Sequence, residues 1–237
     1  MNPLLNHLSG KVLLVAITLS GLLPASVIAQ STLNSVLEEQ TLKVGLINDR
    51  HHYHLTGNGP TGFDYRYARG LADYLGVTLQ VVPFYSETKL YQALTNNTVH
   101  IAAPRFRPAA IKPELAYGPV LFTTTLVGIG PENDAAPCSM TEPRQHLVLP
   151  HLHGAITAIT GSDWQKSEGT DSVTLINKMI DKAEFCTFLP ATWRAALRGY
   201  FPSLNEQLLP GATLSKQWLV RAGDTALLST LYEFTHL

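Results

Sequence analysis

The stretch Gly59-Pro60-Thr61-Gly62-Phe63-Asp64-Tyr65 decides how the rest of the chain is organised. A β-branched-rich run at 42–47 precedes it and is typical of a strand. After it, residues 65–75 place apolar side chains at helical spacing as far as Gly76, and a second strand is predicted at 77–82. The stretch is therefore the first loop of a strand–helix–strand unit. In open α/β sheets, ligands bind beside such loops, at the carboxyl ends of the strands.

Alternation of helical and strand patterns continues along the chain and predicts an α/β fold with mostly parallel sheet pairing. The further expected elements are a helix at 87–95, a strand at 99–103, an apolar β-rich run at 117–130, strands at 147–149 and 155–159, a helix at 173–182, a strand at 184–188, a helix carrying Trp193, a strand at 213–221 and a closing helix at 224–234.

An ordered series of motifs carries a resemblance to a known family. The motifs are Leu42-Lys43-Val44-Gly45, the 59–65 stretch, Leu71-Ala72-Asp73-Tyr74-Leu75-Gly76-Val77, Ile101-Ala102-Ala103 and Tyr117-Gly118-Pro119. In this order they resemble bacterial solute-binding protein family 3, the periplasmic amino-acid receptors of ABC importers. The likeness extends in particular to the N-terminal, non-catalytic domain of membrane-bound lytic transglycosylase F. It is dense over 42–130 and continues thinly to the C-terminus.

The resemblance implies a two-lobed periplasmic binding protein fold of type II, with two hinge crossings and a cleft between the lobes. Lobe 1 is expected at 32–123 plus 217–237, and lobe 2 at 124–216. Ligand capture in such a fold is a hinge closure.

The N-terminus has the pattern of a secretory signal peptide. Lys11 precedes an apolar run at 12–23, Pro24 breaks it, and Val27-Ile28-Ala29 supplies small residues for cleavage. The alternative is a membrane anchor, but the run is shorter than the roughly 20 apolar residues that a spanning helix needs. We therefore predict a cleaved signal peptide at 1–29, a periplasmic location and no stable membrane insertion after cleavage.

Charge and cysteine content narrow the class of protein further. The formal net charge is −1, with 17 basic and 18 acidic side chains and no basic cluster, so a nucleic-acid surface is not expected. Cys138 and Cys186 are the two cysteines. In an exported protein they can form a disulfide, but the sequence gives no separation, and two unrelated thiols are the alternative.

The loop at 50–54 contains His51, His52 and His54, which raises the question of a metal site. No further ligand follows at a helical spacing, so we expect a solvent-facing loop and no metal. The resemblance implies that the aromatic residue of this loop, Tyr53, stacks on the ligand. Loops that the resemblance places on the cleft supply further candidate ligand-binding residues, which are Phe63, Asp64, Tyr85 and Thr124.

Two anchors of the family's amino-acid site are altered. Family members hold the ligand carboxylate with an Arg, whose planar guanidinium matches it, but this chain has 109–112, Ala-Ala-Ile-Lys, at that place. Arg105, Arg107 or Lys112 is the candidate substitute, with a changed geometry; the alternative is that they are solvated surface charges. The family's ammonium-binding Asp is replaced by 189–190, Leu-Pro. A buried ammonium needs a carboxylate, so a free α-amino acid is not expected in the standard pose.

A candidate anion site follows the expected strand at 155–159. There Gly161-Ser162-Asp163 is expected to open a helix and to offer free N–H groups. The alternative is ordinary N-capping by Ser162 or Asp163.

These features predict an exported solute-binding protein that captures a small polar ligand, such as an amino acid, a peptide or a cell-wall fragment, without catalysis and without a cofactor. The alternative is a regulatory or sensor module that acts through a murein enzyme. No carboxylate pair stands out as an acid/base set, and the family's catalytic Glu lies in a separate helical domain that we expect this chain to lack. The expected partners are the ligand and either an ABC importer or a murein enzyme, and the expected state is a monomer.

Overall fold

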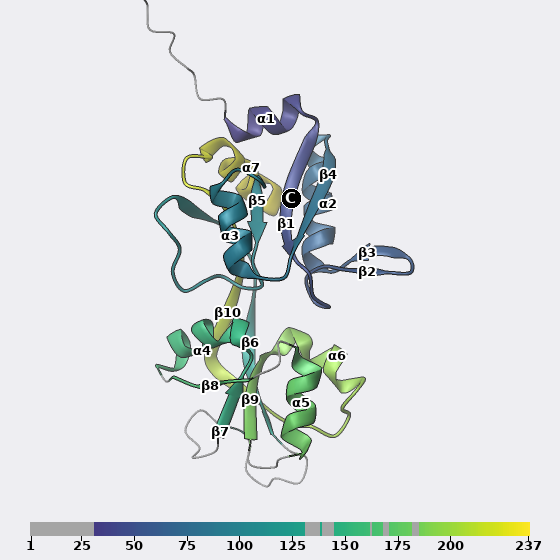
Figure 1. The fold of residues 1–237 in the computed structure, drawn as a ribbon, viewed down its shortest axis with the longest axis vertical. Helices are drawn as coiled ribbons and strands as arrows, with labels where there is room; N and C mark the ends of the chain where they lie inside the picture. The colour runs from purple at the N-terminus through teal and green to yellow at the C-terminus, as the bar shows by residue number, and fades with distance from the viewer. Residues whose placement is uncertain (1–30, 131–137, 139–144, 162, 168–170, 182–184) are drawn as a thin grey trace, which may run out of the picture.

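A computed structural model describes residues 31–130, 138, 145–161, 163–167, 171–181 and 185–237. It consists of two bodies connected by two long strands (Figure 1). The upper body in Figure 1 is called lobe 1 and the lower body lobe 2. The predicted signal peptide lies outside the described residues. No helix in the described part of the chain is both long enough and apolar enough to span a membrane.

Lobe 1 holds most of the N-terminal elements and the last helix. They are α1 (Thr32–Glu38), β1 (Thr41–Ile47), β2 (His54–Thr56), β3 (Gly59–Thr61), α2 (Phe63–Leu75), β4 (Thr78–Phe84), α3 (Glu87–Thr95), β5 (Ile101–Ala103) and α7 (Thr225–Thr235). Strand β1 pairs in parallel with both β4 and β5. One buried cluster packs between this sheet and α2, and a second packs against α3.

The deciding loop needs glycine at one position. Gly62 immediately precedes α2 with φ 118°, a region that favours glycine. A Cβ at this position would lie 2.2 Å from the carbonyl oxygen of His52. The close approach fixes the loop after β1 against the start of α2, which ends at Gly76 in a left-handed conformation.

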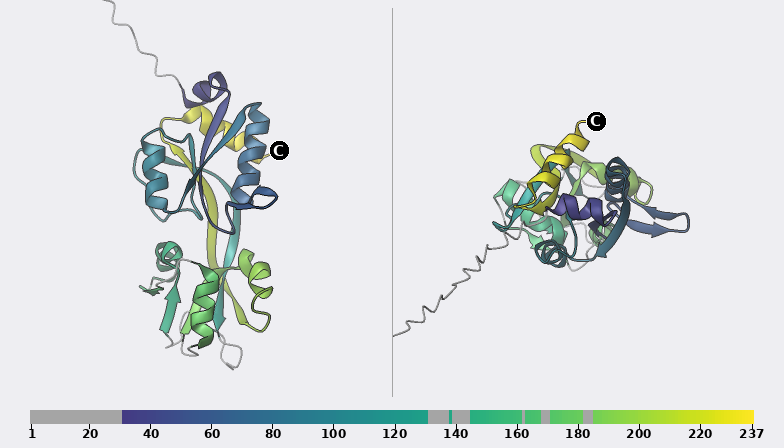
Figure 2. Two further views of the ribbon diagram at one scale, coloured as in Figure 1. Left: turned by 45° about the vertical axis from the view of Figure 1, so that its right-hand side comes forward. Right: turned by 90° about the horizontal axis from the view of Figure 1, so that it is seen from above.

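The two connecting strands are β6 (Leu115–Gly130) and β10 (Asn205–Arg221), which pair antiparallel along most of their length (Figure 2). Along each strand, the side chains at one end pack into the lobe 1 core and those at the other end pack into the lobe 2 core. In β6, Leu121 packs with the lobe 1 core, whereas Leu126 belongs to the lobe 2 core. The lobe boundary predicted at 123/124 falls between these two residues and remains a prediction.

Lobe 2 contains β7 (Gln145–Val148), α4 (Pro150–Thr160), β8 (Gln165–Lys166), α5 (Ser172–Asp181), β9 (Phe185–Pro190), a 3-10 turn η1 (Ala191–Trp193) and α6 (Arg194–Arg198). The whole sheet has the strand order β4-β1-β5-β10-β6-β9-β7-β8. Cys138 and Cys186 form a disulfide with their Cα atoms 5.8 Å apart, so the first of the two alternatives for the cysteines holds. The predicted α/β class with two lobes and two crossings is confirmed.

One predicted element has the wrong type. The run 155–159, expected as a strand, lies inside helix α4. Pro150 occupies the first turn of that helix, and Leu152 and Ile156 are buried one helical turn apart. Gly161 ends the helix in a left-handed conformation with φ 71°. The β-branched residues of this run favoured a strand, but packing of one helical face against lobe 2 decides the structure.

Candidate functional site

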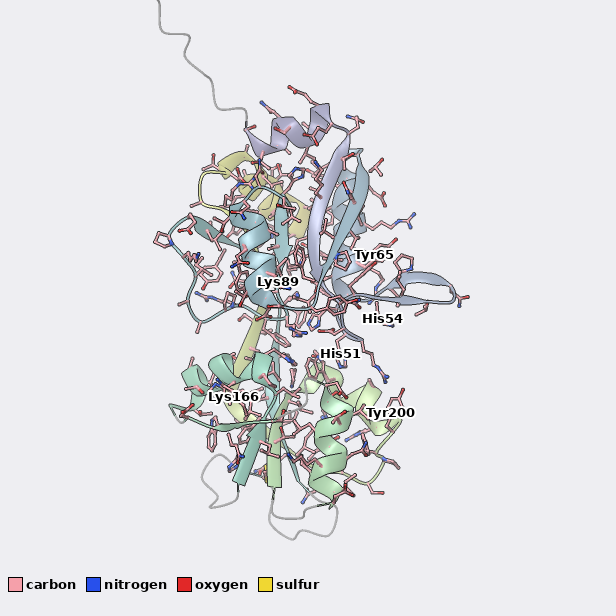
Figure 3. The ribbon with its side chains drawn as sticks, viewed as in Figure 1. His51, His54, Tyr65, Lys89, Lys166 and Tyr200 are labelled. Atoms are coloured by element: carbon pink, nitrogen blue, oxygen red, sulfur yellow. A yellow bond between two sulfur atoms is a disulfide. The ribbon has the colours of Figure 1, made fainter. Side chains whose placement is uncertain are left out.

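Three adjoining hollows lie between the lobes, and residues of both lobes line them. Their volumes are about 300, 380 and 640 Å³. Lobe 1 contributes the loop after β1 and the start of α3, and lobe 2 contributes the starts of α4 and α5 and the turn η1. His51 and Tyr200 mark the facing walls in Figure 3. This region is called the cleft below.

The upper wall of the cleft is a tight loop built around one carboxylate. Asp49 Oδ1 accepts hydrogen bonds from the backbone N–H groups of His51 (3.0 Å) and His52 (2.9 Å). The Nδ1 of His52 also lies 2.7 Å from it. An Asp that bonds the backbone two and three residues ahead holds a turn in a defined shape, and here the turn directs His51 into the cleft.

A charged network continues from this loop along the wall. Arg105 Nε donates to Asp49 Oδ2 at 2.8 Å, and its backbone N–H donates to Glu87 Oε1 at 3.1 Å. Burial by itself raises the pKa of the Asp49 carboxyl, but the hydrogen bond from His52 and the charge of Arg105 outweigh it and hold that pKa well below its usual range. Burial raises the pKa of Glu87, against the charge of Arg105. Arg105 is therefore engaged by carboxylates of the protein itself.

Two contacts bridge the lobes across the cleft. The ring of His51 stacks on Trp193 with the centroids 4.2 Å apart and the planes at 3°. Arg50 donates from Nη1 to the hydroxyl of Tyr200 at 2.6 Å, and its guanidinium lies 5.0 Å from the centroid of that ring. Aromatic stacking contributes about 0.5–1.5 kcal/mol beyond area burial, so these pairs favour the closed arrangement of the lobes.

Two histidines facing the cleft are uncharged near neutral pH. Burial lowers the pKa of His51 to about 4. Burial, followed by the charge of Arg105, lowers the pKa of His151 to about 3. Among the described residues, His151 Nε2 is a buried ring nitrogen without a hydrogen-bond partner. A neutral imidazole nitrogen without a partner in a ligand-sized hollow can hydrogen-bond a ligand.

Three predicted site residues do line the cleft. Phe63 lies in the hollow with His51 and Trp193. Tyr85 and Arg105 lie in the largest hollow. Tyr85 is 79% exposed, and its hydroxyl accepts a hydrogen bond from the Asn48 side chain at 2.9 Å.

Four other predicted site residues lie elsewhere. Tyr53 is buried in the lobe 1 core beside Tyr65, because its ring points away from the cleft. Asp64 is completely buried and accepts bonds from Lys216 Nζ (2.7 Å) and Trp218 Nε1 (2.8 Å). The remaining two, Arg107 and Thr124, lie over the Tyr117 ring at 4.4 Å and in β6 beside the backbone of Thr192, respectively. These side chains are structural contacts rather than lining of the cleft.

The anion site expected at Gly161-Ser162-Asp163 does not have the predicted geometry. Gly161 ends α4 instead of opening a helix, so among the described residues no helix begins at this place. The Asp163 side chain is 88% exposed and lies 3.0 Å from His153 Nε2. Ser162 lies outside the described residues. The error follows from the wrong assignment of 155–159.

Sequence reasoning missed the residues that dominate the cleft. His51 was expected to face solvent, and neither His151 nor Trp193 was assigned a role; Trp193 belongs to the lobe 2 core and also lines the cleft. The signal for His51 was its place at the carboxyl end of a parallel strand. The signal for Trp193 was similar, because η1 directly follows β9.

One set of metal-ligating atoms lies together in the described part of the chain, formed by Cys138, His146 and Cys186 within 4.8 Å of one another. The disulfide occupies both sulfur atoms, and a metal requires thiolates. His51, His52 and His54 do not form such a set.

Two lobes, two antiparallel crossings and a ligand-sized cleft define the architecture of a type II solute-binding protein. Solved structures share it. The arginine-bound form of truncated ArgBP from T. maritima superposes with a TM-score of 0.69 and 17% identity, over 86% of this chain and 98% of that chain. An ancestral cationic amino acid solute binding protein gives 0.64 and 18%, over 87% and 93%.

The relatives found by sequence belong to one kind of protein. They are membrane-bound lytic murein transglycosylases F. That of Shewanella sp. (strain W3-18-1) is 27% identical over 204 residues, which cover 82% of this chain and 43% of the relative. That of Alteromonas mediterranea is 39% identical over 90 residues, 38% of this chain and 19% of the relative. No protein-family model matches. The predicted resemblance to both groups is confirmed, and this chain spans less than half the length of these relatives.

Proposed function

We propose that this protein is an extracytoplasmic binding protein that closes its two lobes around a small polar ligand and performs no chemistry on it. The observation that carries the proposal is the cleft itself, which residues of both lobes line and which the His51–Trp193 pair bridges. Relatives described as membrane-bound and neighbours described as arginine-bound support an extracytoplasmic binding role. The signal peptide pattern at 1–29 supports export from the cytoplasm, as an extracytoplasmic role requires.

The free groups of the cleft suggest how the ligand is held. Arg105 is held by Asp49 and Glu87, so it does not present a free guanidinium to a ligand carboxylate. The exposed ring of Tyr85 and the unpartnered Nε2 of His151 remain. These groups suit a ligand with a ring or apolar part and a few hydrogen-bonding groups. Short peptides and cell-wall fragments have this chemistry, and so do larger amino acids.

A second candidate is a regulatory module that senses cell-wall fragments and acts through a murein enzyme. The observation that favours it is the homology to transglycosylase F, which covers 82% of this chain. The transglycosylase activity of the relatives is not transferred by this match, because the aligned region is 43% of their length.

A thermal-shift screen of the mature chain against amino acids, short peptides and muropeptides tests the proposal. A ligand at 100 times its dissociation constant adds about 2.7 kcal/mol of stability, which raises the midpoint measurably. We expect a hit whose shift is lost in His151→Ala and kept in Tyr74→Ala, a matched exposed position on α2. Absence of any shift with all three ligand classes would contradict the receptor role. A muropeptide hit together with binding to a murein enzyme would favour the regulatory candidate.

A further inference from the structure

The eight-stranded sheet has two edges of very different character. One edge is β8, which has two residues, Gln165 and Lys166. The other is β4, which has seven residues and no charged side chain. Natural sheets protect exposed edges with short strands, Lys or Pro, because unpaired peptide groups invite another strand. β8 is protected in this way, whereas β4 has Pro83 alone.

The peptide groups of β4 alternate between its neighbour and its open side. The Thr78 N–H donates and the Phe84 C=O accepts hydrogen bonds on the β1 side, at 3.0 and 2.7 Å. Successive residues of a strand direct their N–H and C=O groups to opposite sides. The N–H and C=O of Leu79 and Val81 therefore face outward, as does the C=O of Pro83. In the part of the chain that the structure describes, no strand pairs with this side of β4.

A groove of about 520 Å³ runs beside this edge. One wall is a stripe of α2 with a spacing of four residues, formed by Tyr65, Arg69 and Asp73. The other is the start of β4 with Thr78, Leu79 and Val81, and Tyr53 and Pro60 at the β2–β3 hairpin also line the groove. Figure 3 labels Tyr65 beside the strand. Arg69 and Asp73 lie 4.0 Å apart and balance each other, so the groove has no net charge from its wall.

We infer that β4 is a docking edge for an extended peptide segment of a partner protein. The segment adds to the sheet as an outer strand, by backbone pairing with Leu79 and Val81. Its residues directly opposite these two point their side chains to the same face, which is the α2 side with the groove. Strand addition of this kind obtains affinity from main-chain hydrogen bonds and specificity from alternate side chains.

The chemistry of the groove defines the segment. Its lining combines aromatic and aliphatic side chains with the hydroxyl of Thr78 and one balanced ion pair. The segment therefore has an apolar, preferably β-branched side chain at every second position and no net charge.

A second copy of this chain fits the edge less well. Antiparallel pairing of β4 with itself, centred on Gln80, would match Leu79 with Val81. It would also set Pro83 opposite Val77, whose N–H is already bonded to the end of α2 at 3.0 Å. A strand from another protein can donate a free N–H to the Pro83 carbonyl. In the second copy, the residue opposite Pro83 is Val77, whose N–H is not free in this register.

Three peptides of alternating Thr and Val test this inference by fluorescence anisotropy. Peptide A is N-methylated at every Thr, so only its Val residues have a free N–H. When these N–H groups face β4, the Val side chains lie on the groove side. Peptide B is N-methylated at every Val, and peptide C at every residue. We expect saturable one-to-one binding of A, binding of B weaker by about tenfold, and none of C. Equal binding of C, or no binding of A up to about 1 mM, would overturn the inference.

Protein variants separate the edge from other surfaces. Val81→Pro removes an outward N–H and should abolish binding of peptide A, while Val81→Thr keeps that N–H and should bind. Pro83→Val adds an outward N–H and should tighten binding several-fold, which gives a readout that loss of folding cannot imitate. Binding that disappears in His51→Ala would place the peptide in the cleft and overturn the edge assignment. Sedimentation that shows a dimer dissociated by Val81→Pro would instead assign the edge to a second copy.

Discussion

Lobe 1 contains two ion pairs that lie close together and have different surroundings, Asp64–Lys216 and Asp49–Arg105. Asp64 and Lys216 are both completely inaccessible, and Trp218 donates a further hydrogen bond to the carboxylate. Asp49 and Arg105 form an ion pair of the same length class, at 2.8 Å, but in the wall of the cleft. The comparison shows that an ion pair is sealed from water where the protein surrounds it and is partly reached by water where it lies in the wall of the cleft.

The electrostatics of the two ion pairs follow from this difference. Burial lowers the pKa of Lys216, and the Asp64 carboxylate opposes that effect. Removing either member leaves a charge without a partner inside the protein. In the cleft wall, water can reach part of both Asp49 and Glu87, whose side chains are 22% and 25% exposed. Loss of a partner there is less costly.

The largest expected effect is at the buried pair. Asp64→Ala leaves Lys216 unpaired and should lower the free energy of unfolding by about 3–5 kcal/mol. Urea denaturation measures it. The double variant Asp64→Leu/Lys216→Met removes both charges and should recover most of the loss. A single variant that costs under about 1 kcal/mol would show that the pair does not determine stability.

Replacing the cleft arginine should have a smaller effect. Arg105→Ala removes a charged hydrogen bond to Asp49 and should cost about 1.5–3 kcal/mol of stability. The matched control is Arg107→Ala, which removes an exposed guanidinium over Tyr117 and should change stability by less than about 0.5 kcal/mol. Equal losses of stability in the two variants would show that the Asp49–Arg105 network contributes no more to stability than an exposed arginine does.

Acid should destabilise the protein through the two histidines of the cleft. His51 and His151 take up protons near pH 6.5 when unfolded, but only near about 4 and about 3 when folded. The unfolded chain thus binds more protons in this window, so stability falls as pH decreases from 6.5 toward 4. With solvent screening we expect a loss of about 2 kcal/mol between pH 7 and pH 4. Urea midpoints across this range measure it, and His51→Gln/His151→Gln should flatten the profile; an unchanged slope would contradict the assignment.

The smallest expected effect is on the closed arrangement of the lobes. His51→Ala removes the stack on Trp193 and should shift the equilibrium toward the open form by about 0.5–1.5 kcal/mol. Small-angle X-ray scattering without ligand should show a larger radius of gyration. His54→Ala, in the β2–β3 hairpin, is the control and should scatter like the parent protein. A radius unchanged in both variants would indicate that the stack does not hold the lobes.

Much of the fold was predictable because its elements have clear periods. The strand before the deciding loop, the helix after it and the closing helix all repeat apolar residues at two- or four-residue spacing. The run 155–159 was misassigned because Ile and Thr favour a strand locally. The decisive contacts are Leu152 and Ile156 with the lobe 2 core, and a short apolar run does not show which face it buries.

The site was less predictable for a physical reason. Its residues lie in irregular loops, where the direction of each side chain depends on contacts with distant segments. Tyr53 and His51 are two residues apart, yet one enters the core and the other the cleft. Asp64 was taken as a ligand-binding group because its structural partner, Lys216, is 152 residues away in the sequence.

The position of β10 has a consequence for how the chain matures. This strand lies between β5 and β6 in the sheet and supplies both Lys216 and Trp218 to Asp64. A chain that emerges N-terminus first, from a ribosome or a translocation pore, presents β1, α2 and β5 long before β10 follows. Until then the Asp64 carboxylate has no counterion and the nascent half-lobe exposes its apolar face. Lobe 1 can therefore be completed only late in synthesis, when β10 joins the sheet. Until then, chaperones and proteases compete with folding for the exposed apolar face.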